Sequence, residues 1–338
     1  MKHLYIHSAI SISAQEFLSK SLWTELPKAP EVVAAKYPNY RDYIAPALAR
    51  RMAPGVKMST VAAMLALKEG NIKVPDAIMV GTGMGCMQDT ERFLNTIIEN
   101  DEQFMTPTAF IQSTHNTVGA QIALNLKCHA YNNTYVHGTL SFESAINDAQ
   151  LFAMEQPKKT MLIGGVDELG TDFVHYKNNM DQKESPSRTV PLSEGASFFV
   201  VSSEREHASV CIRDMQVITM AMETSIAVEV ANVLKENQLS SAQIDLVLLG
   251  RNGEGTDKYY EVVERQFSEN TQKISFKNYS GAFDTVSAFA TWWAYQILSD
   301  QTLVGIEGSL ASKERYQNIL IYNQHRGRDH SFILLSQC

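Results

Sequence analysis

The sequence has few cysteines and no long apolar segment. Its four cysteines, Cys86, Cys128, Cys211 and Cys338, form no CxxC pair, which argues against a zinc site or a disulfide framework and favours a reducing compartment. No apolar run reaches the roughly 18 residues that a membrane span needs, and residues 1–10 are too short and too polar for a signal peptide. We therefore expect a cytoplasmic protein with no metal site and no membrane contact.

Clusters of basic residues are also missing. The chain carries 29 Lys and Arg against 37 Asp and Glu, a net charge of −8, and the two signs are mixed along its length. Without a basic block or an arginine-rich helix, nucleic acid is not an expected partner. The 338 residues, 44% of them hydrophobic, provide enough core for one large or two medium domains.

Strand-like and helix-like segments alternate twice along the chain. Residues 14–57 and 171–190 are expected as insertions, the second within a polar, loop-rich stretch. Alternation of this kind predicts an α/β fold with helices packed on mostly parallel sheets. The two cycles suggest a duplicated half, residues 1–205 followed by residues 206–338. The strands are expected at 3–13, 77–80, 160–163, 195–202, 208–218, 244–249, 273–276, 318–323 and 331–335.

The stretch from Tyr131 to Ala149 has the pattern of a strand, a turn and a helix. A polar, β-rich run leads to Gly138, and the apolar residues after it recur at i, i+3, i+4 and i+7, which is one face of a helix. Several enzyme folds present a nucleophile at such a turn, because the helix N-terminus offers free N–H groups and a partial positive charge to an oxyanion.

A glycine-rich turn, GTGMG at 81–85, follows the strand expected at 77–80. Its spacing matches neither the dinucleotide pattern GxGxxG nor the phosphate-binding pattern GxxxxGK(S/T). We interpret it as a tight turn and expect no cofactor. No histidine lies near the adjacent Cys86 in sequence, so we interpret this cysteine as a buried structural thiol.

Seven motifs in order resemble those of the β-ketoacyl synthases, over nearly the whole chain. They are GTGMGC at 81–86, PTAF at 107–110 with THNTVG at 114–119, IGGVDE at 163–168, VPLSEGASFFVVSSE at 190–204, NGEGTDKYY at 252–260, KNYSGAFDTVSAF at 277–289 and IYNQHRGRDHSF at 321–332. The resemblance implies the thiolase-like fold of that family, in which duplicated α/β halves form a five-layer αβαβα arrangement.

Aligned by these motifs, the positions that carry catalysis in the family mostly hold other residues here. Thr139 stands at the nucleophilic cysteine, and Asn252 and Ala282 stand at the two catalytic histidines. Arg326 replaces the phenylalanine that gates the pocket and lines the oxyanion hole. The family's lysine is kept, as Lys277.

The family's condensation reaction has chemical requirements that these residues do not meet. Transfer from a carrier-protein thioester needs a thiolate, and the enolate that forms on decarboxylation needs two hydrogen-bond donors. The hydroxyl of Thr139 is a poor nucleophile without an adjacent base. His137 is close in sequence, but we interpret it as a hydrogen-bonded polar residue, and Ala282 has no side-chain donor. We therefore expect no catalytic residues.

Within the family, such a chain resembles the chain-length factors, which pair with an active ketosynthase and shape its acyl tunnel. The resemblance implies a heterodimer or homodimer in fatty-acid, polyketide or polyene biosynthesis, with acyl carrier protein as a further partner. The family's interface segment matches residues 107–112, so Thr108, Ala109 and Phe110 would face the partner's tunnel. Ala109 is small where many members carry a bulky gate residue, which favours a partner that makes a long chain.

Two alternatives stay open. The chain could be an active condensing enzyme or acyltransferase whose nucleophile is Thr139, Cys86 or Cys128. It could also be a homodimeric acyl-binding or scaffold protein that serves no synthase.

Overall fold

The computed structural model describes residues 3–17, 23–30, 32–103, 107–184, 187–301 and 315–338. Ten strands form one continuous sheet in the order β10-β9-β11-β12-β8-β1-β7-β5-β3-β4. A second sheet pairs β2 (Val32–Val33) with β6 (Leu192–Ser193). In chain order the ten strands are β1 (Leu4–Ile12), β3 (Ala77–Gly81), β4 (Tyr131–Tyr135), β5 (Met161–Asp167), β7 (Gly195–Ser202), β8 (Val210–Thr219), β9 (Leu246–Leu249), β10 (Gln272–Ser275), β11 (Asn318–His325) and β12 (Asp329–Gln337).

The ten-stranded sheet consists of two sets of five strands that repeat one strand order. The two sets meet where Leu4–Ile6 of β1 pairs with Val210–Ile212 of β8. We number the strands of each set from 1 to 5 along the chain. Read from the outer edge of the sheet toward the junction of the two sets, both sets then have the order 3-2-4-5-1. In both, the second, third and fourth strands are parallel and the fifth is antiparallel to the fourth. A duplicated half would produce this repetition.

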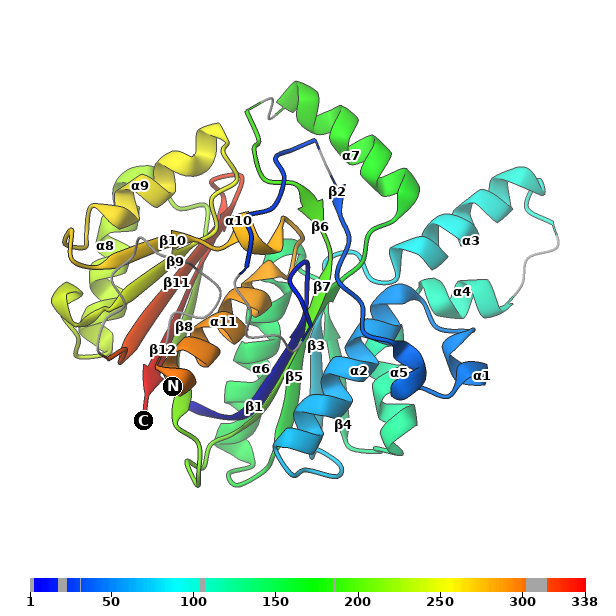
Figure 1. Ribbon diagram of the computed structural model, residues 1–338, viewed down its shortest axis with the longest axis horizontal. Coiled ribbons are helices and arrows are strands. Elements are labelled where there is room, and N and C mark those ends of the chain that lie inside the picture. The colour runs from blue at the N-terminus through cyan, green and yellow to red at the C-terminus, as the bar shows by residue number, and fades with distance from the viewer. Residues whose placement is uncertain (1–2, 18–22, 31, 104–106, 185–186, 302–314) are drawn as a thin grey trace.

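Helices separate the two sets and cover their outer faces, which gives five layers (Figure 1). The helices α6 (Ser141–Glu155) and α11 (Val286–Asp300) lie between the sets and contact strands of both. One outer face is covered by α2 (Pro54–Glu69) and α5 (Thr117–Leu126), and the other by α8 (Glu223–Glu236) and α9 (Lys258–Glu264). Buried apolar residues form one central cluster and one under each outer layer. The fold is therefore the expected αβαβα arrangement.

The expected strand, turn and helix at residues 131–149 are confirmed. They form β4, the 3₁₀ turn η2 (Gly138–Leu140) and α6. The apolar face of α6 is fully buried in the central cluster, with Phe142, Ala145, Ile146 and Ala149 all at 0% exposure. Burying a large apolar side chain contributes roughly 1.5–3 kcal/mol, so this face fixes the helix and, with it, the turn at its N-terminus.

The prediction of a loop-rich stretch near residues 171–190 is wrong, because Thr171–Glu184 forms the helix α7. This helix has little amphipathic pattern of its own and is stabilised by α3 (Met87–Glu99) beside it. Oε1 of Glu91 accepts a hydrogen bond from the backbone N–H of Phe173 at 2.7 Å. The amide of Asn95 donates to Asp172 at 2.9 Å. The backbone N–H groups of a first helical turn lack partners within the helix. Tertiary contacts that satisfy this turn thus determine that the segment is helical.

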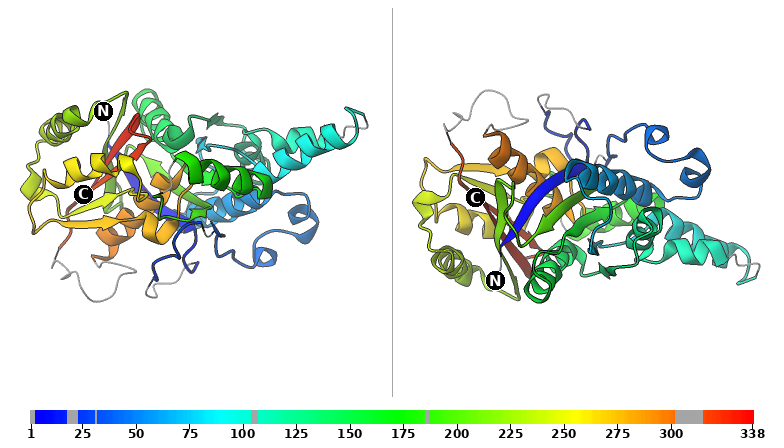
Figure 2. Two further views of the ribbon diagram at one scale, coloured as in Figure 1. Left: turned by 90° about the horizontal axis from the view of Figure 1, so that it is seen from above. Right: turned by 90° about the horizontal axis from the view of Figure 1, so that it is seen from below.

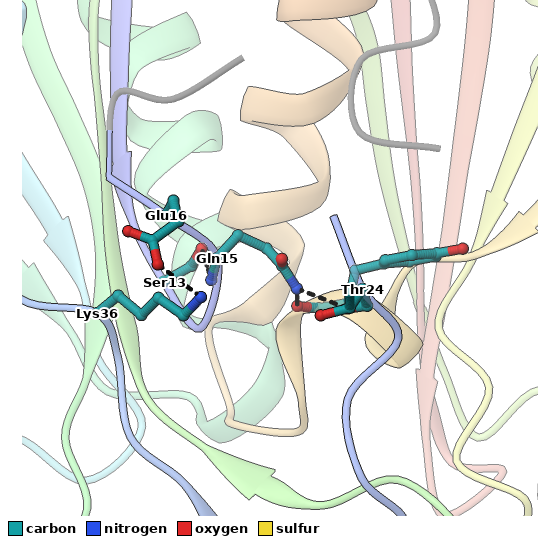
Figure 3. Close-up of polar contacts among 6 residues, drawn as sticks. Ser13, Gln15, Glu16, Thr24 and Lys36 are labelled. Carbon is teal, nitrogen blue, oxygen red and sulfur yellow. Dashed lines mark hydrogen bonds and ion pairs between the residues drawn. The ribbon is translucent and has the colours of Figure 1, made fainter. Parts of the chain in front are cut away.

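The insertion expected at residues 14–57 is irregular and contains η1 (Tyr40–Asp42) and α1 (Pro46–Ala49) before α2 begins. Figure 3 shows how its start is fastened. Nε2 of the buried Gln15 donates to the carbonyl oxygens of Thr24, at 3.3 Å, and of Tyr279, at 2.7 Å. Lys36 forms an ion pair with Glu16 at 2.8 Å. Tyr279 belongs to α10 (Lys277–Ser280), so the hydrogen bond from Gln15 joins the start of the insertion to a short helix of the C-terminal half.

Candidate functional site

A cavity of about 860 Å³, open solvent at its mouth included, lies where both sets of parallel strands end. In α/β folds the loops after the carboxyl ends of the strands commonly form the binding site. Residues that follow β5, β9, β10 and β11 all contribute to the wall, and α7 contributes Phe173 and Lys177. The polar and charged lining consists of Thr139, Asp167, Glu168, Lys177, Arg188, Ser193, Asn252, Glu254, Lys277, Asp284, His325 and Arg326.

The five residues predicted at the family's catalytic positions are brought together by the fold. Thr139, Asn252, Lys277, Ala282 and Arg326 all line this cavity, although they come from both halves of the chain. Their roles stay predictions.

Thr139 lies in the turn η2, directly before α6, and is half-buried. The turn is built on Gly138, whose φ of +55° is a left-handed conformation that glycine adopts without strain. Ser141 closes the turn, since its Oγ accepts from the backbone N–H of His137 at 2.8 Å and donates to the carbonyl of Thr82 at 2.9 Å. The His137 ring hydrogen-bonds to Oγ of Ser144 at 2.8 Å, in line with its interpretation as a hydrogen-bonded polar residue.

Lys277 is the most buried cation of the cavity wall, with 5% of its surface exposed. Its Nζ donates a hydrogen bond to Oδ1 of Asn252 at 3.0 Å. Burial lowers the pKa of Lys277 to about 8, against the opposing effect of Glu254, Asp257 and Asp284. The loop that carries Asn252 is held by Asp257, which accepts from the backbone N–H groups of residues 252 and 253 at 3.1 and 2.8 Å.

Ala282 contributes a methyl group to the wall, and its backbone is fixed on both sides. Its N–H donates to the carbonyl of Pro191 at 2.9 Å, and its carbonyl accepts from the N–H of Ser193 at 3.0 Å. Arg326 lies in the turn between β11 and β12 and is exposed, with a φ of +53°. The neighbouring His325 has its pKa lowered to about 4, first by burial and then by the charges of Lys277, Arg326 and Lys177.

The sequence analysis missed Asp284, which also lines the cavity. A Cβ atom on Gly83 would lie 2.0 Å from Oδ2 of Asp284, so the glycine turn passes directly over this carboxyl group. Burial, followed by the charge of the nearby Asp167, raises the pKa of Asp284 to about 7, against the opposing effect of Lys177 and Lys277. The sequence did contain a signal for this residue: Asp284 is the one acidic residue among the small and apolar residues of the run 281–290.

Asp167 differs from Asp284 because the protein itself satisfies its oxygens. Oδ1 accepts from the N–H of Gly83 at 2.8 Å and of Met84 at 3.2 Å. Oδ2 accepts from both the N–H and the hydroxyl of Thr285, each at 2.8 Å. The carboxylate therefore fastens the glycine turn of the N-terminal half to α11 of the C-terminal half.

Cys86 and Cys128, proposed as displaced nucleophiles, lie outside this cavity. Both are buried in the apolar cluster under α2 and α5. Burial raises the pKa of the Cys86 thiol well above its usual range, which disfavours the reactive thiolate. Within the described residues, no group of three His, Cys, Asp or Glu side chains could hold a metal ion, and no helix has the length and apolarity to cross a membrane.

The predicted interface segment lies on a projecting arm. Figures 1 and 2 show α3 and α4 (Pro107–Ser113) extending together from the body. Thr108 is exposed, and Phe110 is 56% exposed, with its ring 5.7 Å from that of Phe93. The side chain of Ala109 lies outside the described part of the structure. The arm also exposes Leu94, Ile98 and Ile111.

Comparison with known proteins adds independent findings. Residues 23–245 match the family model described as beta-ketoacyl synthase, N-terminal domain. The fold is similar to a beta-ketoacyl synthase from Burkholderia phymatum STM815, with a TM-score of 0.81 and 14% identity over 100% of both chains. It is similar to the ishigamide ketosynthase/chain length factor, with a TM-score of 0.76 and 12% identity over 99% of both chains.

A third similar structure is the ketosynthase ApeO in complex with its chain length factor ApeC from Xenorhabdus doucetiae. Its TM-score is 0.73, with 13% identity over 100% of this chain and 98% of that one. A sequence search of curated proteins finds no match. At identities this low, the structural similarities establish the fold.

Proposed function

This chain belongs to the β-ketoacyl synthase family, and we propose that within it the chain is a chain-length-factor-like subunit without condensing activity of its own. It pairs with an active ketosynthase in fatty-acid, polyketide or polyene biosynthesis. In that pair it shapes the tunnel that holds the partner's growing acyl chain.

The composition of the cavity wall carries this proposal. Among the described lining residues there is no cysteine, and the turn before α6 presents the hydroxyl of Thr139 instead. A hydroxyl needs an adjacent base to act as a nucleophile. The nearest histidine in sequence, His137, is exposed and hydrogen-bonded to Ser144. Cys86 and Cys128 are buried elsewhere.

Two observations support a partner chain. The arm formed by α3 and α4 exposes four large apolar side chains, Leu94, Ile98, Phe110 and Ile111, and contiguous exposed apolar surface is characteristic of protein–protein interfaces. Two of the similar structures are described as a ketosynthase with a chain length factor.

Co-expression with the ketosynthase encoded nearest to this chain tests the pairing. We expect the two chains to co-purify and to elute from a size-exclusion column as a heterodimer. A homodimer that excludes the ketosynthase would overturn the pairing and favour the scaffold alternative.

Incubation of the chain alone with acyl-loaded carrier protein tests the absence of condensing activity. We expect intact-mass spectrometry to show no covalent acyl adduct. An adduct on the wild type that disappears in Thr139→Ala would contradict the proposal and identify the hydroxyl as the nucleophile. The conservative variant Ser144→Ala, whose hydroxyl contacts His137, serves as the matched control.

A further inference from the structure

The cavity retains ionisable groups that a disused acyl pocket would not need. Taking a charge out of water costs several kcal/mol unless partners compensate for it. Lys277 nevertheless keeps its amine in the wall with 5% exposure, and Asp284 lines the same cavity. Buried charged groups kept at this cost point to a ligand that interacts with them.

The pair formed by Lys277 and Asn252 presents hydrogen-bond donors to the cavity. An ammonium can only donate, so the Asn252 atom that faces it at 3.0 Å must be the amide oxygen. The amide NH₂ of Asn252 then points away from Lys277, and no described residue accepts a hydrogen bond from it. The ammonium has three donors, and among the described residues Oδ1 of Asn252 is its one hydrogen-bond acceptor.

Further cations line the same cavity. Lys177, Arg188 and Arg326 also line the cavity, and each already has an interaction within the protein. Four carboxyl groups, those of Asp167, Glu168, Glu254 and Asp284, line the cavity with these cations and Lys277. They offset the positive charge only in part near neutral pH, because burial raises the pKa of Asp167 and raises those of Glu168 and Asp284 to about 7. The wall thus favours an anionic ligand at neutral and lower pH.

Asp284 adds a further hydrogen-bonding group to the same cavity. Within the described part of the chain no side chain or N–H group donates a hydrogen bond to its carboxyl group. In its protonated form it has one O–H donor in addition to its acceptor oxygen. It can therefore hydrogen-bond to a hydroxyl or carbonyl oxygen of a ligand.

We propose that this cavity binds a short-chain carboxylate bearing a second oxygen function, with its carboxylate on the Lys277 ammonium and the Asn252 amide and its second oxygen on Asp284. The inference rests on the proposal that the cavity carries out no condensation, and it assigns a ligand class to that same site. It does not depend on the partner chain.

Calorimetric titration of the purified chain with 3-hydroxybutyrate at pH 6.5 tests this assignment. We expect saturable binding, and none by the uncharged 3-hydroxybutyramide. Lys277→Met keeps the length of the side chain without its donors, and Asn252→Leu removes the amide. Each is expected to weaken binding roughly ten-fold or more, as for the loss of a hydrogen bond to a charged group. The matched control is Lys273→Met, at a half-buried lysine on β10 that does not line the cavity.

The outcomes separate this inference from the proposed function. Equal binding by carboxylate and amide, or unchanged affinity in both folded variants, would overturn it. Tighter binding of decanoate than of 3-hydroxybutyrate would also overturn it and would indicate an apolar acyl pocket. Circular dichroism of Asn252→Leu, a half-buried loop position, shows whether a loss of binding reflects unfolding. Pairing with a ketosynthase is a separate measurement, so either proposal can fail alone.

Discussion

The Nζ atom of Lys277 donates a hydrogen bond to Oδ1 of Asn252 across 3.0 Å. The two residues follow neighbouring parallel strands, β10 and β9, and the contact joins the two positions that we predicted, from the resemblance, to match the family's lysine and one of its histidines. An amide can replace an imidazole as the acceptor for this lysine. It cannot take up a proton at neutral pH, which is consistent with a site that binds rather than condenses.

Carboxylate binding should depend on pH through Asp284. Its pKa is raised from 3.8 to about 7, so below pH 7 it is mostly neutral and above pH 7 it repels an anion. The charged groups that face it are Asp167, Lys177 and Lys277. We expect the affinity for 3-hydroxybutyrate to fall between pH 6 and 7.5, by at most about ten-fold per unit. In Asp284→Asn the fall should be smaller, because Glu168 is then the remaining carboxyl group of the wall with a pKa of about 7. An identical pH profile would contradict the role of Asp284.

Replacing Glu143 should stabilise the protein at high pH. Burial raises the pKa of this carboxyl group, in the first turn of α6, from 4.5 to about 7. A raised carboxyl pKa means that the folded state holds the proton more tightly, so stability is lost as pH rises from about 4.5 to 7. The shift corresponds to about 3 kcal/mol.

We therefore expect the free energy of unfolding of Glu143→Gln, measured relative to that of the wild type, to be higher at pH 8 than at pH 5. Urea denaturation at both values measures this. Gln can hydrogen-bond with Ser331, which now donates to Oε1 at 2.8 Å. An equal difference between variant and wild type at both pH values would contradict the prediction.

Truncating the buried face of α6 should destabilise the fold far more than truncating its exposed face. Ile146 has 0% exposure and Leu151, on the same helix, has 54%. Ile146→Ala is expected to cost about 2–5 kcal/mol, because it removes buried methyl groups and leaves a cavity. Leu151→Ala should stay within roughly 0.5 kcal/mol. Chemical denaturation of the isolated chain compares the two.

Placing a charge on the projecting arm should prevent pairing with the ketosynthase. Phe110→Asp puts an unpaired carboxylate into the proposed interface, where burial of a charge is unfavourable. Met222→Asp is the matched control, because Met222 is 72% exposed directly before α8. Figure 1 shows α8 at the end of the molecule opposite α3. Size-exclusion chromatography of co-expressed chains should show loss of the heterodimer only for Phe110→Asp.

A bulky residue at position 109 should shorten the partner's product. This prediction comes from the resemblance, which places Ala109 at the position of the family's gate residue. In Ala109→Phe the ring would occupy part of the tunnel, so we expect mass spectrometry to show shorter acyl products at an unchanged yield of heterodimer. Products of unchanged length would remove this role from Ala109.

Sequence patterns were sufficient where the local signal and the tertiary environment agree. The helix α6 was predictable because Phe142, Ala145, Ile146 and Ala149 recur with helical spacing, and the same face is fully buried. The helix α7 was missed because it has no such pattern and owes its first turn to Glu91 and Asn95 of another helix.

By itself, the sequence was enough to predict the family and most of the order of strands and helices. It also gave the prediction that Thr139, Asn252, Lys277, Ala282 and Arg326 stand at the family's catalytic positions. Ordered motifs and hydrophobic periodicity are local properties of a chain, so they can be read without a structure. Only the tertiary structure placed Asp284 beneath Gly83 and the donors of Lys277 and Asn252 in one wall. Those relationships depend on distances between segments that no sequence spacing specifies, and the burial that shifts each pKa arises only when both halves are packed together.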